Sequence, residues 1–371
     1  WDEVSDRPED VLIVYRSTAA QKSYTGLKYG QGRPSVSATD GLFSILGSIA
    51  AITDIIIDNF KFLRYGWVLP SDFFRLLIAL PFKRIMFRGL FNRFHCQYFW
   101  AKDDYNSEHA LRSLELRRAG GVALGMMHGI PSIASIVHQL RHIDFDIYYV
   151  HGRYQFERYH LKKWAKKMKV QAVGSLGLSR EEFYRQANSP KGNGVACFLS
   201  RTFQADKTFA AVIKVALAFP ERTFHVSIKT KELDVPIYGP RARKFLAMAP
   251  KNVVYHAGRS YELFFSCRTA LSEGSTLAAE AVQFGLESYI FDFSPDHWKI
   301  MDYRNFPEIF VDSAEAVIKK MKKVEAGTFT YPREIFAPLI EMNGRIPWDI
   351  IREDMGLTPK PNFEKHRKPI L

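Results

Sequence analysis

The second half of the chain alternates short apolar runs with segments of helical spacing, and this alternation most constrains the fold. The apolar runs are VACFLSR, TFHVSIK, NVVYHAG, TALSEG and ESYIFDF. They are rich in β-branched and aromatic residues, and helical segments such as KTFAAVIKVALAFP separate them. Because consecutive parallel strands need a crossover segment between them, this order predicts a parallel sheet covered by helices.

The first half shows the same order from residue 120 onward. GVALGMMHG (Gly121–Gly129), FDIYYVHG (Phe145–Gly152) and VQAVGSLGL (Val170–Leu178) are expected strands. SREEFYRQA opens with a Ser-x-x-Glu capping box at Ser179, and NSPKGNG (Asn188–Gly194) is a linker. We therefore expect an α/β protein with two Rossmann-like domains, 1–190 and 191–345, facing each other across a cleft. Ligands of such sheets bind outside the carboxyl ends of the strands.

The segment Lys61–Phe99 is both basic and aromatic, with seven Lys or Arg, one Asp and eleven aromatic residues. This pattern predicts an extra helical segment of the first domain that lies in a membrane interface. Arg84, Arg88 and Arg93 would then meet lipid phosphates. Two alternatives are a core helix pair with basic stems covering apolar surface, and a nucleic-acid site, for which no recognised module is present.

The stretch GLFSILGSIAAITDIIIDNF (Gly41–Phe60) is strongly apolar but contains Asp54 and Asp58. No apolar run reaches the roughly 18 residues that a membrane-spanning helix needs. The pattern predicts a buried helix instead.

Charge and cysteine content narrow the class of partner and the compartment. Lys and Arg exceed Asp and Glu by 52 to 39, which gives a net charge of +13 and favours an anionic partner. The three cysteines are far apart and form no CxxC pair, so neither a disulfide framework nor a zinc site is expected. These features suit a cytoplasmic protein, and the basic-aromatic segment would place it peripherally at the inner face of the membrane.

The stretch LSEGSTLAAEAVQFGLESYIFDF (Leu271–Phe293) predicts a strand, a tight turn and a helix. Gly274 would let the backbone approach a ligand, and the Ser275 and Thr276 hydroxyls with the first helical N–H groups would form a phosphate pocket. Glu280 lies one turn further on the same helix face and could accept hydrogen bonds from a ribose. The alternative is an ordinary helix cap with Glu280 a solvated surface charge.

The segment ALSEGSTLAAEAVQFGLESYIFD (Ala270–Asp292) resembles the nucleotide-binding domain of GT-B glycosyltransferases, particularly those that build bacterial surface and capsular polysaccharides. The shared order is an acidic or polar loop, a Gly-Ser-Thr turn, Glu-Ala in a helix and a Gly before the next strand. Glu273 and Glu280 are seven residues apart, whereas the commonest retaining families have eight. The catalytic role that the family suggests for Glu273 and the stereochemistry therefore stay open.

The resemblance implies further donor-binding residues in the second half of the chain. A basic residue after the first strand would meet the donor phosphates, two lysines after the next strand would point at the site, and a third strand would meet the nucleobase. The corresponding residues here are Arg201, Lys229, Lys231, Val254 and His256. It also implies that the last helix, within 346–371, returns toward the first domain.

The first domain offers His128, in MMHGIPS, as the general base. A similar His-Gly turn lies in the acceptor domain of the related polyol-phosphate transferases, and a histidine suits proton abstraction near neutral pH. The alternative is a buried structural imidazole. His151 is the second choice for this role. A third choice is the acidic group Asp103, Asp104, Glu108 and His109, for which a helix cap in an exposed charged turn is the competing interpretation.

These patterns together predict a glycosyltransferase that moves a sugar from a nucleotide-activated donor to a lipid-linked or polysaccharide acceptor. No cofactor and no metal are expected, since no metal motif is present. The expected partners are the nucleotide sugar, the acceptor and the membrane surface, with no nucleic acid. Alternatives on the same fold are a CDP-activated polyol-phosphate transferase and a nucleotide-sugar epimerase. A non-catalytic membrane- or nucleic-acid-binding protein is the alternative from another class.

Overall fold

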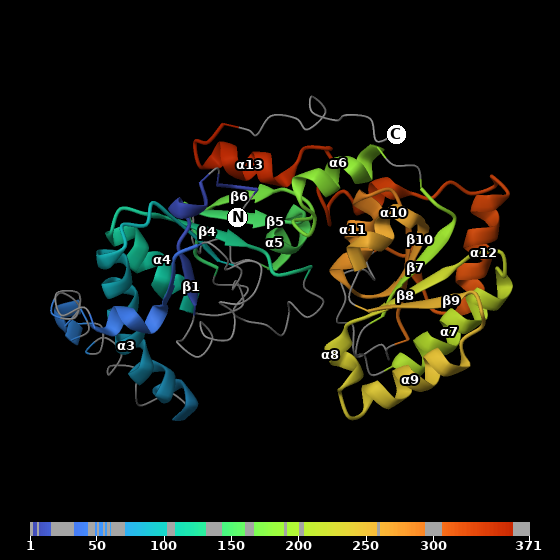
Figure 1. Cartoon of the computed structure of the whole chain (residues 1–371), viewed down its shortest axis with the longest axis horizontal. Helices are drawn as coiled ribbons and strands as arrows, with labels where there is room; N and C mark the ends of the chain where they lie inside the picture. Colours follow the sequence, from blue (N-terminus) through green and yellow to red (C-terminus); the bar gives the residue numbers. More distant parts are fainter. Residues whose placement is uncertain are drawn as a thin grey trace.

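The computed structural model describes residues 3–5, 7–15, 33–43, 71–101, 108–130, 143–159, 167–188, 191–199, 204–257, 260–293 and 306–358, together with residues 49, 52–54, 56, 57 and 60. Two parallel sheets stand side by side with helices around them (Figure 1). The first sheet runs in the order β3 (Tyr98–Ala101), β4 (Val122–Met126), β5 (Ile147–Val150) and β6 (Lys169–Ala172). A separate parallel pair joins β1 (Ile13–Tyr15) to β2 (Ser35–Ser37).

The second sheet has six strands in the order β12-β11-β10-β7-β8-β9. Their bounds are β7 (Gly194–Phe198), β8 (Phe224–Ile228), β9 (Val253–Ala257), β10 (Cys267–Glu273), β11 (Glu287–Phe291) and β12 (Phe310–Val311). From the central strand β7 the chain builds outward to β9 and then returns to the other side of β7 at β10. This reversal is the topological switch point at which doubly wound sheets bind ligands. The α/β class and the two Rossmann-like domains predicted from the sequence are confirmed.

The described helices cover these sheets and join them. They are α3 (Ser71–Arg93), α4 (Glu108–Arg118), α5 (Arg153–Tyr159), α6 (Arg180–Asn188), α7 (Ala205–Ala218), α8 (Thr230–Leu233), α9 (Tyr238–Met248), α10 (Leu263–Ser266), α11 (Thr276–Gln283), α12 (Ala314–Glu325) and α13 (Pro347–Asp354). Short 3-10 helices are η1 (Pro8–Asp10), η2 (Ala38–Phe43), η5 (Ser260–Glu262) and η8 (Arg333–Phe336). Every residue of β7 is buried, as expected for a central parallel strand covered on both faces.

Helices α6 and α13 lie on the same side of the molecule, α6 over the junction of the two sheets and α13 over the first sheet (Figure 1). The predicted capping box begins α6, because Ser179 N–H donates to Glu182 Oε2 (2.9 Å) and Glu182 N–H donates to Ser179 Oγ (3.2 Å). The domain boundary expected at residue 190 would place α6 in the first domain. Phe183 of α6, however, packs in a core cluster with residues of the second sheet. On α13, Ile350 and Ile351 pack in a core cluster with first-sheet residues.

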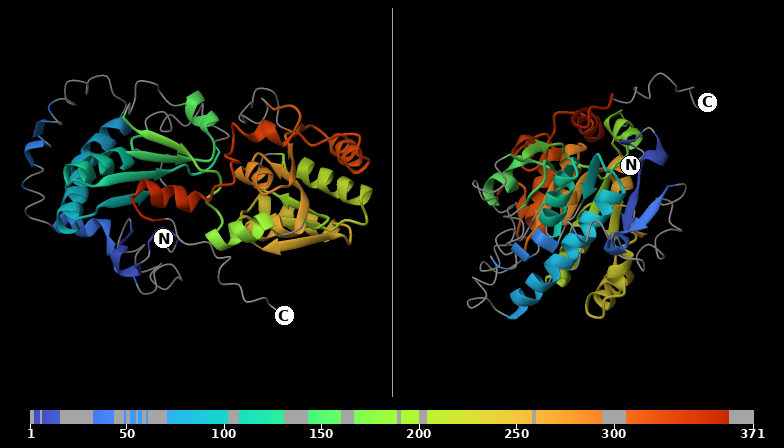
Figure 2. Two further views of the ribbon diagram at one scale, coloured as in Figure 1. Left: turned by 90° about the horizontal axis from the view of Figure 1, so that it is seen from above. Right: turned by 90° about the vertical axis from the view of Figure 1, so that its left-hand side faces the viewer.

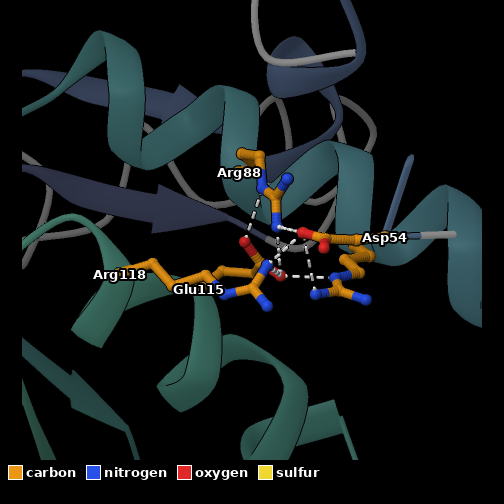
Figure 3. Close-up of polar contacts among 5 residues, drawn as sticks. Asp54, Arg88, Glu115 and Arg118 are labelled. Carbon is orange, nitrogen blue, oxygen red and sulfur yellow. Dashed lines mark hydrogen bonds and ion pairs between the residues drawn. The ribbon is translucent and has the colours of Figure 1, made fainter. Parts of the chain in front are cut away.

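Arg84 and Arg88 of α3 do not lie on the surface, so their predicted contact with lipid is wrong. They are only 4% and 9% exposed and both bind the buried carboxylate of Glu115 on α4 (Figure 3). Arg84 Nε and Arg88 Nε lie 2.6 and 2.7 Å from the Glu115 oxygens. Arg93 is exposed, with its guanidinium 5.2 Å from the centre of the Phe94 ring. Two of the three arginines are therefore structural.

Asp54 completes this ion cluster from outside α3 and α4. Its carboxylate accepts hydrogen bonds from Arg88 (2.7 Å), Arg118 (2.6 Å) and Arg84 (3.3 Å) (Figure 3). The hydrogen bond from Arg88 contributes most to lowering the pKa of Asp54 below its ordinary value. Burial alone would lower the pKa of Arg88, but the hydrogen bonds to Glu115 and Asp54 outweigh it and the pKa is raised. Both shifts favour the charged forms of Asp54 and Arg88, which face each other in the cluster.

The described residues of 49–60 are helical but not buried, which corrects the prediction for this stretch. Ile49, Ile52, Ile56, Ile57 and Phe60 are all exposed. These residues lie at the end of the first domain that is far from the second sheet (Figures 1 and 2). Among the described residues, no helix combines the length and the apolar character needed to cross a membrane.

Candidate functional site

The predicted strand–turn–helix lies at the switch point of the second sheet. β10 ends at Glu273 and α11 begins at Thr276, with Ser275 as its N-cap. Ser275 Oγ accepts a hydrogen bond from Leu277 N–H (3.3 Å). Other N–H groups at the start of α11 lie at the positive end of the helix dipole, and such groups favour a bound anion. The helix therefore begins just beyond the carboxyl end of β10, the strand that pairs with β7 where the sheet order reverses.

The first domain meets this turn directly, through the segment after β4. Ile130 N–H donates to Thr276 Oγ1 at 2.8 Å. His128, two residues earlier, is exposed. The structure therefore brings the loop that carries His128 together with the Ser275–Thr276 turn. The alternative of a buried imidazole is wrong for His128.

Gly129 makes this approach possible. A Cβ atom at this position would lie 2.8 Å from Thr276 Oγ1, closer than real Cβ contacts. We expect Gly129→Ala to lower the free energy of unfolding by about 1 kcal/mol or more, as overpacking does. Thermal unfolding measures this loss. It should shrink in a Thr276→Ala background, where the obstructing oxygen is absent, and an equal loss in both backgrounds would contradict the contact.

Glu280 on α11 links the two domains. Its side chain is 2% exposed, so the alternative of a solvated surface charge is wrong. Glu280 Oε1 accepts a hydrogen bond from Ser175 Oγ of the first domain (2.6 Å), and the Tyr261 hydroxyl donates to the same carboxylate (3.0 Å). Burial and the Glu280 charge together raise the pKa of Tyr261. Glu280 is thus an acceptor for hydroxyl groups, which here come from the protein.

Gln283, one turn further along α11, strengthens the same junction. Its Oε1 accepts a hydrogen bond from Ser175 N–H at 2.8 Å. Gly177 lies under Tyr261, because a Cβ there would come within 2.0 Å of the Tyr261 ring and hydroxyl. The loop after β6 therefore packs against both α11, through Gln283, and η5, through Tyr261.

Glu273 is also buried, at 5% exposure, but it is held within its own domain. Its Oε1 accepts a hydrogen bond from Thr208 Oγ1 of α7 at 2.7 Å. Burial and the charge of Glu273 both raise the pKa of Tyr238. A catalytic role for Glu273 stays a prediction.

The other predicted donor residues lie along the edge of the second sheet beyond β7. Lys229 and Lys231 are exposed at the end of β8 and in α8, and Val254 is exposed on the edge strand β9. His256 Nε2 lies 2.9 Å from Nδ1 of His225 on the neighbouring strand. Arg201 and Asp104 lie outside the described residues.

The imidazole pair makes stability depend on pH. Burial first, and the neighbouring His256 second, lower the pKa of His225 below its ordinary value of 6.5. The unfolded chain then binds more protons than the native one, so the stabilisation is complete above pH 6.5 and is lost as the pH falls below it. We expect His225→Gln to flatten the melting temperature between neutral and mildly acidic pH. An unchanged slope would contradict this assignment.

The described residues proposed as the second and third choices for the general base make contacts that hold the first domain together. His151 is buried, with Nδ1 3.1 Å from the Gly174 carbonyl oxygen. His109 is buried against Phe145 (4.9 Å between ring centres) and accepts a hydrogen bond from Asp144 N–H. Glu108 pairs with Lys83, and Asp103 lies outside the described residues. His151 and His109 are therefore buried, whereas His128 is exposed, and the role of His128 as the base stays a prediction.

The described residues form no cluster of metal-binding side chains. No three His, Cys, Asp or Glu side chains come together there as a group that could hold an ion. That no metal or cofactor is needed stays a prediction.

Sequence reasoning missed Ser175, Gln283, Tyr261 and Thr208. Ser175 follows directly after β6, so the rule that sites lie at carboxyl ends of parallel strands could have indicated it. Thr208 and Gln283 lie within helices, where a polar residue carries no such signal. Their partners depend on how the helices pack.

Comparison with known proteins assigns the chain to no family. No family model matches it, and no curated protein sequence matches it. Among solved structures, UDP-GlcNAc 2-epimerase from Neisseria meningitidis is 10% identical, with a TM-score of 0.44 over 75% of this chain and 80% of that one. The E. coli protein described as trehalose-6-phosphate bound with UDP-2-fluoro glucose is 14% identical (TM-score 0.44, 76% and 78% covered). The wall teichoic acid polymerase TagF with CDPG is 12% identical (TM-score 0.44, 70% and 72% covered).

Proposed function

We propose that this chain is a glycosyltransferase that moves a sugar from a nucleotide-activated donor to a lipid-linked or polysaccharide acceptor at the inner face of a membrane. The observation that carries the proposal is the hydrogen bond between Ile130 N–H and Thr276 Oγ1. It joins the start of α11 at the switch point, where the donor phosphates would bind, to a loop that carries an exposed histidine. A transferase needs these two parts close together.

The donor would lie along the carboxyl ends of the second sheet. Its phosphates would bind the Gly274–Thr276 turn, with Arg201, Lys229 and Lys231 supplying positive charge. The nucleobase would lie near His256, toward the carboxyl end of β9, with Val254 nearer the amino end of the same strand. To bind Glu280, the ribose hydroxyls would have to replace the Ser175 or Tyr261 hydroxyl, because this carboxylate is buried and already accepts a hydrogen bond from each.

His128 would act as the general base. As the acceptor hydroxyl attacks the anomeric carbon, the imidazole takes its proton and the bond to the nucleotide phosphate breaks. Negative charge then develops on the leaving phosphate, where the α11 N–H groups would stabilise it. Glu273 and Asp104 stay further candidates for an acid or base, the first held by Thr208.

A thermal-shift screen tests the donor site. CMP, CDP, UDP, GDP and ADP are each added with and without EDTA, since a ligand that binds only the folded state raises the melting temperature. We expect one nucleotide to stabilise the wild type and to have little effect on Arg201→Ala or Thr276→Val. Lys319→Ala, on α12, is the matched control and should behave as the wild type.

Other outcomes separate the alternatives. No shift from any of the five nucleotides contradicts a nucleotide-dependent enzyme. Stabilisation by a cytidine nucleotide alone would favour the polyol-phosphate transferase. Conversion of the nucleotide sugar without an acceptor would identify an epimerase instead of a transferase.

A further inference from the structure

Helix α9 carries four exposed side chains in a single line. Ile237, Arg241, Lys244 and Met248 are all exposed, and the two aliphatic side chains are 72% and 64% exposed. The backbone of Ile237, the N-cap, is already helical (φ −91°, ψ −43°), so the helical spacing includes it. At 3.6 residues per turn the four positions fall within an arc of about 60°. We call these four residues the α9 stripe, in which two cations lie between two aliphatic side chains.

Helix α9 lies along the lower edge of the second domain in Figure 1, and its core contacts fix its orientation. Tyr238, Ala242 and Phe245 are buried in the core of the second sheet. The Phe245 ring stacks on Phe209 of α7, with 4.6 Å between the ring centres. These buried positions lie on a different side of the helix from the α9 stripe. The packing that holds α9 in place therefore leaves the stripe at the surface.

The segment that carries the stripe is basic throughout. Residues 237–251, IYGPRARKFLAMAPK, contain four Lys or Arg and no Asp or Glu. Arg241 lies 3.4 Å from Asp206 of α7, but the two side chains are 45% and 66% exposed, and such surface pairs contribute little. Lys251, just after the end of α9, is also exposed. This charge favours an anionic partner for the stripe.

We propose that the α9 stripe docks on an anionic phospholipid surface. Lipid phosphates would meet its cations, while its aliphatic side chains enter the interface beside them. A nucleic acid would leave Ile237 and Met248 without a role, because bases stack on aromatic rings and guanidinium planes. A second copy would bring the same basic stripe to a two-fold contact, where like charges repel. The proposal goes beyond the proposed function by placing lipid contact on the second domain, and it does not involve the predicted donor residues.

Vesicle sedimentation of the full chain, without nucleotide, tests the proposal. The probes are vesicles of phosphatidylcholine with phosphatidylglycerol in equal parts, and vesicles of phosphatidylcholine alone. We expect the wild type to bind the anionic vesicles more tightly. Arg241→Gln/Lys244→Gln should weaken that binding by about tenfold or more, because each cation near a charged surface adds to the affinity. Ile237→Ser/Met248→Ser should also weaken it by about tenfold, because less apolar surface enters the interface.

A matched control removes the same charge from another helix. Lys319→Gln/Lys322→Gln replaces two exposed lysines of α12 and should bind as the wild type. An equal loss in this control would show attraction by net charge alone and would overturn the site on α9. Wild-type binding by both stripe variants would overturn the proposal, and equal binding to the two vesicle types would overturn the anionic surface.

Further readouts separate the other occupants from lipid. Binding to a single-stranded oligonucleotide that Arg241→Gln/Lys244→Gln loses and Ile237→Ser/Met248→Ser retains, with no vesicle binding, would assign the stripe to nucleic acid instead. A wild-type dimer that becomes monomeric in both variants would assign it to a second copy. The nucleotide-induced thermal shift should be the same in the wild type and both variants, so lipid binding and donor binding can fail separately. Should a double variant fold poorly, Lys244→Gln and Met248→Ser test the stripe singly.

Discussion

Replacing Glu115 by glutamine is expected to lower the free energy of unfolding by about 3–5 kcal/mol, the usual cost of removing one partner from a buried ion pair. The Glu115 side chain is fully enclosed, and it is the carboxylate that both Arg84 and Arg88 contact through Nε. Glutamine has nearly the same shape, so the loss comes from charge and not from a cavity. Of the two carboxylates described in this cluster, Asp54 would then be the one that remains to bind the arginines.

Denaturant unfolding followed by tryptophan fluorescence measures this loss. Glu157→Gln is the matched control, because Glu157 pairs with Arg153 on the exposed face of α5 and should cost less than about 1 kcal/mol. The double variant Glu115→Gln/Arg88→Met should lose less stability than the sum of its single variants, since each removes the other's unpaired partner. A Glu115→Gln variant as stable as the wild type would contradict the buried cluster.

Replacing His128 by alanine is expected to lower kcat by about a hundredfold or more, the typical contribution of a general base. His128 is exposed, and Ile130, two residues on, binds the Thr276 hydroxyl at the proposed phosphate site. Because the base acts on the acceptor proton, nucleotide binding should be unaffected. The effect therefore belongs in kcat and not in the affinity for the donor.

Steady-state transfer assays with the nucleotide identified by thermal shift provide the measurement. His95→Ala is the control, because His95 is also exposed in the first domain but lies after α3, away from the switch point. Its rate should match that of the wild type. Full activity of His128→Ala would remove this residue from the mechanism, and weaker nucleotide binding in the same variant would reassign it to the donor site.

The alternation of strands and helices was predictable because each strand of a parallel sheet carries its own signal. TFHVSIK contains the whole of β8, and NVVYHAG contains the whole of β9. The Ser-x-x-Glu box correctly predicted the start of α6. Strand order was not predictable, since it depends on pairings between residues far apart in the sequence. The switch point between β7 and β10 appeared only in the structure.

The errors concern charges and apolar residues whose partners lie far away in the sequence. Arg84 and Arg88 match an interfacial pattern by composition, yet Glu115, about thirty residues later, buries them. Asp54 looked like an interruption of a buried helix, whereas it anchors that helix with its isoleucines outward. Glu280 stays a predicted donor residue, and its contacts with Ser175 and Tyr261 could not be predicted because they depend on the packing of the two domains.

Amide hydrogen exchange with and without the stabilising nucleotide tests the central claim most directly, because it reports where the ligand binds. The account predicts slower exchange in residues 271–283, which hold the β10–α11 turn, and in residues 122–130, which end in the His128 loop. Exchange in α12, on the far part of the second domain, should not change. Protection confined to other segments, with both of these unaltered, would contradict a donor site at the junction of the two domains.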